Sequence, residues 1–172
     1  MAAFADYILT RELQSVDGGL LALTSPTTVI SAGTDTGSAA VALGFTFSYD
    51  DVDYTSCTVY SDGWLRFAGP WPASQYENNV FDNLSNTSVS LHPWHDDLIT
   101  QASTGYVRHE TLGSAPNRYC VIEWRCYGKY NHNASHNVLL TFQVVLRETT
   151  GNIEFRYAPA GADYGVTGSP SY

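Results

Sequence analysis

The 172-residue sequence predicts an all-β fold, an antiparallel β-sandwich or jelly roll. Aromatic residues make up 13% of the chain, led by 12 Tyr, whereas Met occurs once. Aromatic and β-branched residues favour strands over helices. Short segments of alternating apolar and polar residues also recur along the chain, with no amphipathic helical pattern between them, which is typical of a sandwich or barrel.

The clearest alternation lies in the second half of the chain. Residues 119–127 predict a strand because every second residue is apolar. The expected inward face consists of Cys120, Ile122, Trp124 and Cys126. Residues 138–147 and 153–157 repeat the pattern on either side of a short loop that contains Gly151. The two segments therefore predict a β-hairpin.

The rest of the chain supplies weaker strand and turn signals. Further strands are expected at 41–47, 54–60, 64–67 and 105–111. Turns are expected at Asp50-Asp51 and at Ser61-Asp62-Gly63. No strand pattern is found in 2–14, 68–90 and 128–137, and the second of these spans is rich in Asn, Ser and Pro, which predicts a long surface loop.

The length fits one domain, since domains commonly contain roughly 100–200 residues. We expect residues 1–30 to form an N-terminal arm or edge strand and residues 31–172 to form a single β-sandwich domain. The three cysteines, Cys57, Cys120 and Cys126, are expected to be reduced core residues, because an odd number in a chain of this size is a poor match to a disulfide framework. A pair between Cys57 and one of the other two stays open.

Charge and hydropathy exclude two classes of partner. Eight Lys and Arg against 17 Asp and Glu give a net charge of −9, so the average field repels a phosphate backbone and nucleic-acid binding is not expected. No apolar run approaches the ~18–20 residues of a membrane span. The first residues lack the basic and apolar regions of a secretory signal, so we expect synthesis and assembly in the cytoplasm.

Four stretches together resemble a β-sandwich domain of bacterial surface and secreted proteins and of phage structural proteins, and they are similar to the nidogen-type extracellular domain. They are residues 43–47 (LGFTF), 61–67 (SDGWLRF), 111–118 (TLGSAPNR), and 142–146 with 154–157. The resemblance implies a non-catalytic module for adhesion or assembly. Gly63 would permit a left-handed turn, and Leu65 and Phe67 are expected in the core.

The segment 92–97 contains the most specific candidate for a metal-binding site. His92, His95, Asp96 and Asp97 could ligate a divalent ion, with Zn²⁺ favoured by imidazole and Ca²⁺ by carboxylate. The alternative, which we favour, is a turn in which the carboxylates accept backbone N–H bonds while Trp94 packs inward. No cofactor is therefore expected, with Ca²⁺ or Zn²⁺ as the candidate ions.

No catalytic motif accompanies this segment, and we do not expect an enzyme. Neither a Gly-x-Ser-x-Gly elbow nor a His-Glu-x-x-His zinc motif occurs. Aromatic residues in or beside the expected loops could stack on sugar rings. These candidate ligand-binding residues are Trp71, Tyr76, Tyr127 and Tyr130. Their alternative role is to cap the ends of the sandwich or to line a subunit interface.

The sequence as a whole predicts a structural protein of a phage virion, a capsid decoration protein or else a tail or fibre component, located at the virion surface. Its expected partners are virion proteins such as the major capsid protein and other copies of itself in a closed homo-oligomer. The alternative is a carbohydrate-binding or adhesive module of a bacterial surface protein, located outside the cell, whose partner would be a glycan.

Overall fold

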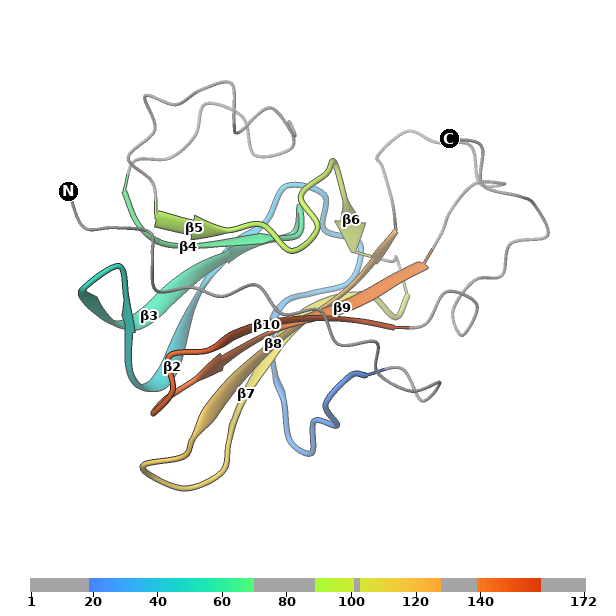
Figure 1. Ribbon diagram of the computed structural model, residues 1–172. Helices are drawn as coiled ribbons and strands as arrows, with labels where there is room; N and C mark the ends of the chain where they lie inside the picture. The colour runs from blue at the N-terminus through green and yellow to red at the C-terminus, as the bar shows by residue number, and fades with distance from the viewer. Residues whose placement is uncertain (1–18, 70–88, 101–102, 128–138, 159–172) are drawn as a thin grey trace.

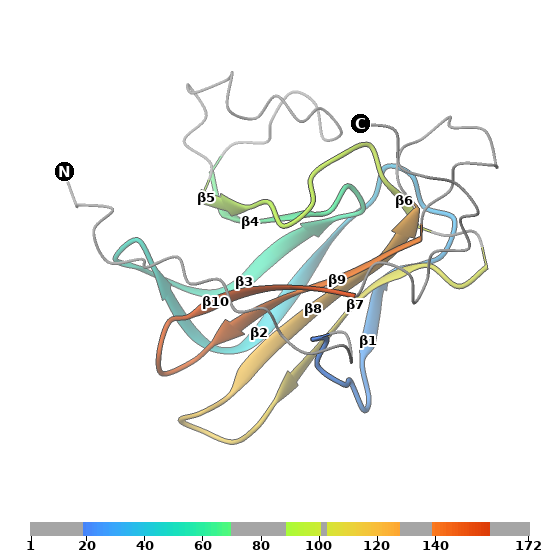
Figure 2. The same ribbon diagram turned by 45° about the vertical axis from the view of Figure 1, so that its right-hand side comes forward.

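The computed structural model describes residues 19–69, 89–100, 103–127 and 139–158. Within these ranges every regular element is a strand, and the strands form two antiparallel sheets packed as a sandwich (Figures 1 and 2). The predicted all-β sandwich is confirmed. The described ranges contain no helix long and apolar enough to span a membrane.

The smaller sheet has four strands in the order β2-β3-β4-β5, drawn cyan to green in Figure 1. Its strands are β2 (Ser38–Tyr49), β3 (Val52–Tyr60), β4 (Trp64–Ala68) and β5 (Val89–Leu91). The turn between β2 and β3 falls on Asp50 and Asp51, as predicted, and both residues adopt positive φ angles of 52° and 58°. Asp tolerates this left-handed region better than most residues, which explains its use here.

The larger sheet has the order β1-β7-β8-β9-β10, and β6 pairs with the end of β8. Its strands are β1 (Thr27–Ile30), β6 (Ile99–Thr100), β7 (Tyr106–Leu112), β8 (Tyr119–Tyr127), β9 (Leu139–Arg147) and β10 (Ile153–Tyr157). β9 and β10 form the predicted hairpin. In Figure 2, β1 and β10 lie on opposite sides of this sheet, and β8 lies between them.

Two short strands, β5 and β6, were not predicted, and β1 lies at the end of the span 1–30 that was expected to form an arm or an edge strand. β1, β5 and β6 contain four, three and two residues, too few for an alternating pattern to be recognised. The two ends of the predicted loop 68–90 accordingly belong to strands: Ala68 ends β4, and Val89 and Ser90 lie in β5, because backbone pairing of β4 with β5 extends the sheet into that span.

The core lies between the two sheets. The predicted inward face of β8 is fully buried, and it packs in one apolar cluster with the inward residues of β2. Trp124 stacks on Phe142 of β9 with ring centroids 5.3 Å apart, and its indole N–H donates to the backbone oxygen of Tyr60 across the sandwich at 2.8 Å. All three cysteines are free thiols buried in this layer, as predicted.

The outer face of the larger sheet is covered, contrary to the polar outward face that alternation in β8 predicts. Val121 and Glu123 point outward, yet Val121 is fully buried and Glu123 is only 4% exposed. The cover includes residues 19–26, which we call the strap. The strap bonds to the outer face near β10 and β9 and then near β7, and β1 follows it.

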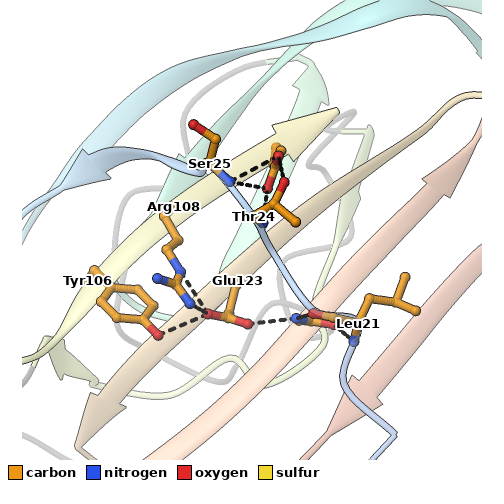
Figure 3. A network of polar contacts seen from close by, with 8 residues as sticks. Leu21, Thr24, Ser25, Tyr106, Arg108 and Glu123 are labelled. Carbon is orange, nitrogen blue, oxygen red and sulfur yellow. Dashed lines mark hydrogen bonds and ion pairs between the residues drawn. The ribbon is translucent and has the colours of Figure 1, made fainter. Parts of the chain in front are cut away.

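Side chains of the sheet hold the strap by its backbone. Gln143 makes a two-bond clamp on Leu21, accepting its N–H at 2.8 Å and donating to its carbonyl at 2.9 Å. The Glu110 carboxylate accepts the N–H groups of Thr24 and Ser25 at 2.7 and 3.1 Å (Figure 3). Arg156 donates to the carbonyl of Gly19 at 2.6 Å. Glu110 also accepts a bond from the Thr24 hydroxyl at 2.8 Å, and the other bonds of these clamps reach main-chain groups of the strap.

The clamps on Gly19 and Leu21 belong to a row of four polar residues in direct register, one on each of four strands. The row, which we call the polar row, consists of Arg108, Glu123, Gln143 and Arg156. One oxygen of Glu123 accepts bonds from Arg108 at 2.6 Å and from the Tyr106 hydroxyl at 2.9 Å, and the other accepts from Gln143 at 2.6 Å (Figure 3). A buried carboxylate is tolerated here because donors surround both oxygens.

We predict that Gln143→Leu releases the strap. The change removes both bonds to Leu21 and leaves an oxygen of buried Glu123 without its Gln143 donor, so it should lower the free energy of unfolding by about 2–3 kcal/mol. Amide hydrogen exchange should show the Leu21 N–H losing its protection. Thr28→Ala, an exposed change on β1, is the control and should leave that protection intact. Unchanged protection of Leu21 in the Gln143 variant would contradict the clamp.

Candidate functional site

Residues 92–98 form the connection between β5 and β6, where the chain passes from the smaller sheet to the larger one. The turn at residues 61–63 holds this connection. The carbonyls of Gly63 and Asp62 accept the N–H groups of Trp94 and Asp96, each at 3.3 Å. The Asp62 carboxylate accepts the Leu98 N–H at 3.2 Å. A tight turn of the smaller sheet thus positions the whole predicted constellation.

Gly63 is the closest point of contact between turn and connection. Its φ of +77° lies in the left-handed region, as predicted, and a Cβ placed on it would lie 1.9 Å from the backbone oxygen of Trp94. Both constraints demand glycine. Leu65 and Phe67, the other predicted residues of this motif, lie in the core and against it, respectively.

His92 and His95 face one another beside an aromatic stack. The ring of His92 lies parallel to Trp64 with centroids 5.4 Å apart, and Trp64 in turn stacks on Tyr60 at 3.8 Å. The Nδ1 atoms of the two histidines are 3.2 Å apart, and Nε2 of His92 is 2.8 Å from the Ser90 hydroxyl. Burial, and next the proximity of His95, lower the pKa of His92 to about 4, so this imidazole is neutral at pH 7.

The two predicted acidic ligands, Asp96 and Asp97, follow the histidines in the same connection. Asp96 accepts the backbone N–H of Asp97 at 2.9 Å, as in the predicted turn, but Trp94, which that turn was expected to pack inward, is 41% exposed. In the described ranges, no group of three or more His, Cys, Asp or Glu side chains is arranged to hold a metal ion. The converging Nδ1 atoms of His92 and His95 are the part of the predicted set that could bind one, and Zn²⁺ or Ca²⁺ binding stays a prediction.

Ser90, His92 and His95 lie in a row whose connectivity is that of a nucleophile with its base. A general base works best with a pKa near the working pH, whereas that of His92 lies near 4. The ring of His92 also packs on buried Trp64.

The predicted sugar-stacking residues are mostly beyond what the structure describes. Trp71, Tyr76 and Tyr130 lie outside the described residues. Tyr127 is the last residue of β8, where its backbone pairs with Ile99 of β6 and Leu139 of β9. Their role as ligand-binding residues stays a prediction.

A different set of aromatic side chains is exposed at one edge of the sandwich. We call Trp94, Phe155 and Tyr157 the aromatic edge; their exposed fractions are 41%, 43% and 42%. Trp94 packs against Phe142 and Tyr157 with centroids 6.3 and 6.1 Å apart, and the Tyr157 hydroxyl donates to the carbonyl of Pro93 at 2.8 Å. The connection 92–98 and β10 therefore meet here.

The sequence pattern missed the aromatic edge for a simple reason. Alternation in 153–157 places Ile153, Phe155 and Tyr157 on one face of a strand, which predicts an inward face. Alternation carries no information on which strand ends the sheet. Because β10 is the last strand in the order of the larger sheet, its inward residues are only partly covered by the opposite layer.

Asp62 is the one buried aspartate of the described residues, with 2% of its surface exposed. Burial raises the pKa of its carboxyl to about 7, and the nearby charges of Asp97 and Asp35 raise it as well. The bonds from Leu98 and Ser61 oppose the shift without cancelling it. A carboxyl that changes charge near neutral pH therefore lies directly under the connection that carries Trp94.

Comparison with protein families gave one match. A family model described as NIDO related matches residues 13–171, almost the entire chain. Comparisons with curated proteins and with solved structures found no match.

We predict that Gly63→Ala displaces the connection 92–98 and lowers the free energy of unfolding by at least about 2 kcal/mol, because strain at positive φ adds to the clash with Trp94. Gly151→Ala is a matched control. Its φ is also positive, at +66°, but its Cβ would meet only Ser48 O at 4.0 Å. Chemical denaturation measures both. Equal losses in the two variants would contradict a tight turn-to-connection contact.

We predict that Asp62→Asn removes a pH dependence of stability. The folded-state pKa is raised above the ordinary 3.8, so the folded protein holds this proton more tightly than the unfolded chain, and wild-type stability should fall as pH rises from about 4 to about 7. Asparagine keeps an oxygen for the Leu98 N–H and has no proton to lose. The thermal midpoint of the variant should therefore rise relative to that of wild type as pH increases towards 7.

Asp51→Asn in the exposed β2–β3 turn controls for a general change of charge. Parallel curves would contradict the assignment.

Proposed function

Because the chain belongs to the NIDO-related family, we propose that it is a non-catalytic assembly module that joins protein subunits at an exterior surface. The observation that carries this proposal is the aromatic edge, where three large side chains are each about two-fifths exposed beside the last strand of the larger sheet. Exposed aromatic side chains in a group mark contact surfaces, and Trp and Tyr are enriched in interfaces.

The geometry of the aromatic edge favours a protein partner over a glycan. The rings of Trp94 and Tyr157 meet at 62°, so together they do not form one flat surface. The Tyr157 hydroxyl already donates to Pro93 and so is committed within the chain. An edge strand also offers backbone groups that another polypeptide can pair with, a mode of recognition that a sugar lacks.

The titratable side chains support a role without catalysis. His92 is a weak base, as described above. Burial raises the pKa of the Cys120 thiol to about 12 and raises the pKa of Cys57 and Cys126 as well, so none of the three forms a reactive thiolate near neutral pH.

The setting that we propose is the outer surface of a phage particle, where the chain would act as a capsid decoration protein. A module that binds neighbours through a strand edge suits a shell of repeated subunits. The net charge of −9 fits a surface that faces away from packaged nucleic acid. A bacterial surface adhesin is the alternative setting.

We predict that Trp94→Ala weakens incorporation into the particle while leaving the fold intact, because the side chain is 41% exposed and its loss removes contact area chiefly from a partner. Quantitative mass spectrometry of purified virions, with the culture supernatant as the second fraction, measures incorporation. Val52→Ala is the matched control, since Val52 is 49% exposed on β3, in the other sheet.

Two results would overturn this proposal. In the first, the chain is absent from every particle, and it binds a glycan array in a way that Trp94→Ala abolishes. The aromatic edge would then be a sugar-binding surface. The other is equal incorporation of the Trp94 and Val52 variants and wild type, which would remove the aromatic edge from the interface.

A further inference from the structure

The outer edge of β10 has an arrangement of backbone groups that can be derived from the hairpin. Arg147 donates its N–H to the carbonyl of Asn152, and Ala158 donates to the carbonyl of Thr141, so residues 152 and 158 face β9. Backbone groups along an antiparallel strand point alternately to the two sides. The N–H and C=O groups of Ile153, Phe155 and Tyr157 therefore point away from β9, and among the described strands none lies beyond β10 to pair with them.

The sequence of β10, Ile-Glu-Phe-Arg-Tyr, is complementary to itself when reversed about Phe155. In an antiparallel pair of two such strands, Phe155 lies opposite Phe155 of the second copy, and Ile153 lies opposite Tyr157. Glu154 then lies opposite Arg156, and this match of charge occurs twice. Opposite charges across an antiparallel pair stabilise it, and like charges destabilise it.

We propose that a second copy of this chain pairs with β10 across a two-fold axis centred on Phe155, joining two six-stranded sheets into one. This inference rests on the proposed assembly function and names the first partner at its edge. The three outward-facing residues of each strand would form the hydrogen-bonded pairs, so all their edge N–H and C=O groups find partners. A two-fold axis requires one self-complementary surface, which this strand supplies.

The pairing also explains the exposure of apolar residues on β10. Phe155 and Tyr157, 43% and 42% exposed, would pack against Phe155 and Ile153 of the second copy on the inner side of the joined sheet. Glu154 and Arg156 lie on the opposite side, where Glu154 bonds within the chain to Arg156 at 2.6 Å and to Arg147. The second copy would extend this ion pair into a four-membered network of alternating charge across the axis.

Charge also selects the register. Centring the axis on Glu154 would place two Glu154 carboxylates face to face, and centring it on Arg156 would oppose two guanidinium groups. Either arrangement sets like charges directly opposite at the closest spacing of the ladder, since residues 154 and 156 occupy non-hydrogen-bonded positions towards the partner. Phe155 is the centre that avoids both repulsions.

Oxidative cross-linking of Phe155→Cys tests the register directly. At a hydrogen-bonded antiparallel pair the Cα atoms lie about 5.5 Å apart, within the range that a disulfide spans. The variant should form a disulfide-linked dimer on mild oxidation, because the native cysteines are buried. Val52→Cys, equally exposed on β3, should stay monomeric on a denaturing gel. Equal cross-linking of the two variants, or none at Phe155→Cys, would overturn the pairing.

Analytical ultracentrifugation over a concentration series tests the backbone bonds. Phe155→Pro removes an outward N–H without touching the β9 ladder, a substitution that edge strands tolerate. Phe155→Thr removes the ring but keeps the N–H. We expect a wild-type dimer that Phe155→Pro shifts to monomer more strongly than Phe155→Thr does. A monomeric wild type would overturn the self-pairing. The proposed assembly function would still stand in that case if Trp94→Ala reduced the incorporation of this monomer into particles.

Discussion

The indole of Trp124 imposes the constraint on which much of this structure depends. A large apolar ring belongs in the core, yet its one polar group cannot be buried without an acceptor. The acceptor is the carbonyl of Tyr60 at the end of β3, in the opposite sheet. This single bond fixes the end of β3 over the middle of the larger sheet, at the point where the turn 61–63 begins.

The consequences of that constraint extend to the surface. Because Tyr60 is held, the turn that follows it has a fixed place, and its backbone holds the connection 92–98 through Trp94 and Asp96. The connection in turn places Trp94 against Tyr157 of β10. A hydrogen bond in the core is thus linked, through the turn 61–63 and the connection 92–98, to the exposed aromatic edge that we propose as the interface.

The outer face of the larger sheet differs from the core in that it buries a charged side chain, Glu123. Glu123 is compatible with the interior because the polar row and Tyr106 donate to both its oxygens, and the strap covers the row by bonding to Gln143. One face of this sheet is therefore closed by the chain itself. Its last strand, β10, is one of the two end strands of the larger sheet and carries exposed Phe155 and Tyr157 as well as an unpaired edge among the described strands.

The sequence by itself determined the all-β class, the position of the longer strands, the hairpin, the Asp50-Asp51 and Gly63 turns and the burial of the three cysteines. These features depend on neighbouring residues: alternation along one strand, or a left-handed backbone at one position. The resemblance to the nidogen-type domain likewise rests on local motifs, and the family match agrees with it.

The remaining features depend on the tertiary structure. It brought the Nδ1 atoms of His92 and His95 together, buried Glu123 under the strap, and made β10 an end strand of its sheet. Each of these outcomes depends on which strands become neighbours, and contacts between residues more than a hundred positions apart, such as Leu21 with Gln143, leave no trace in a local pattern.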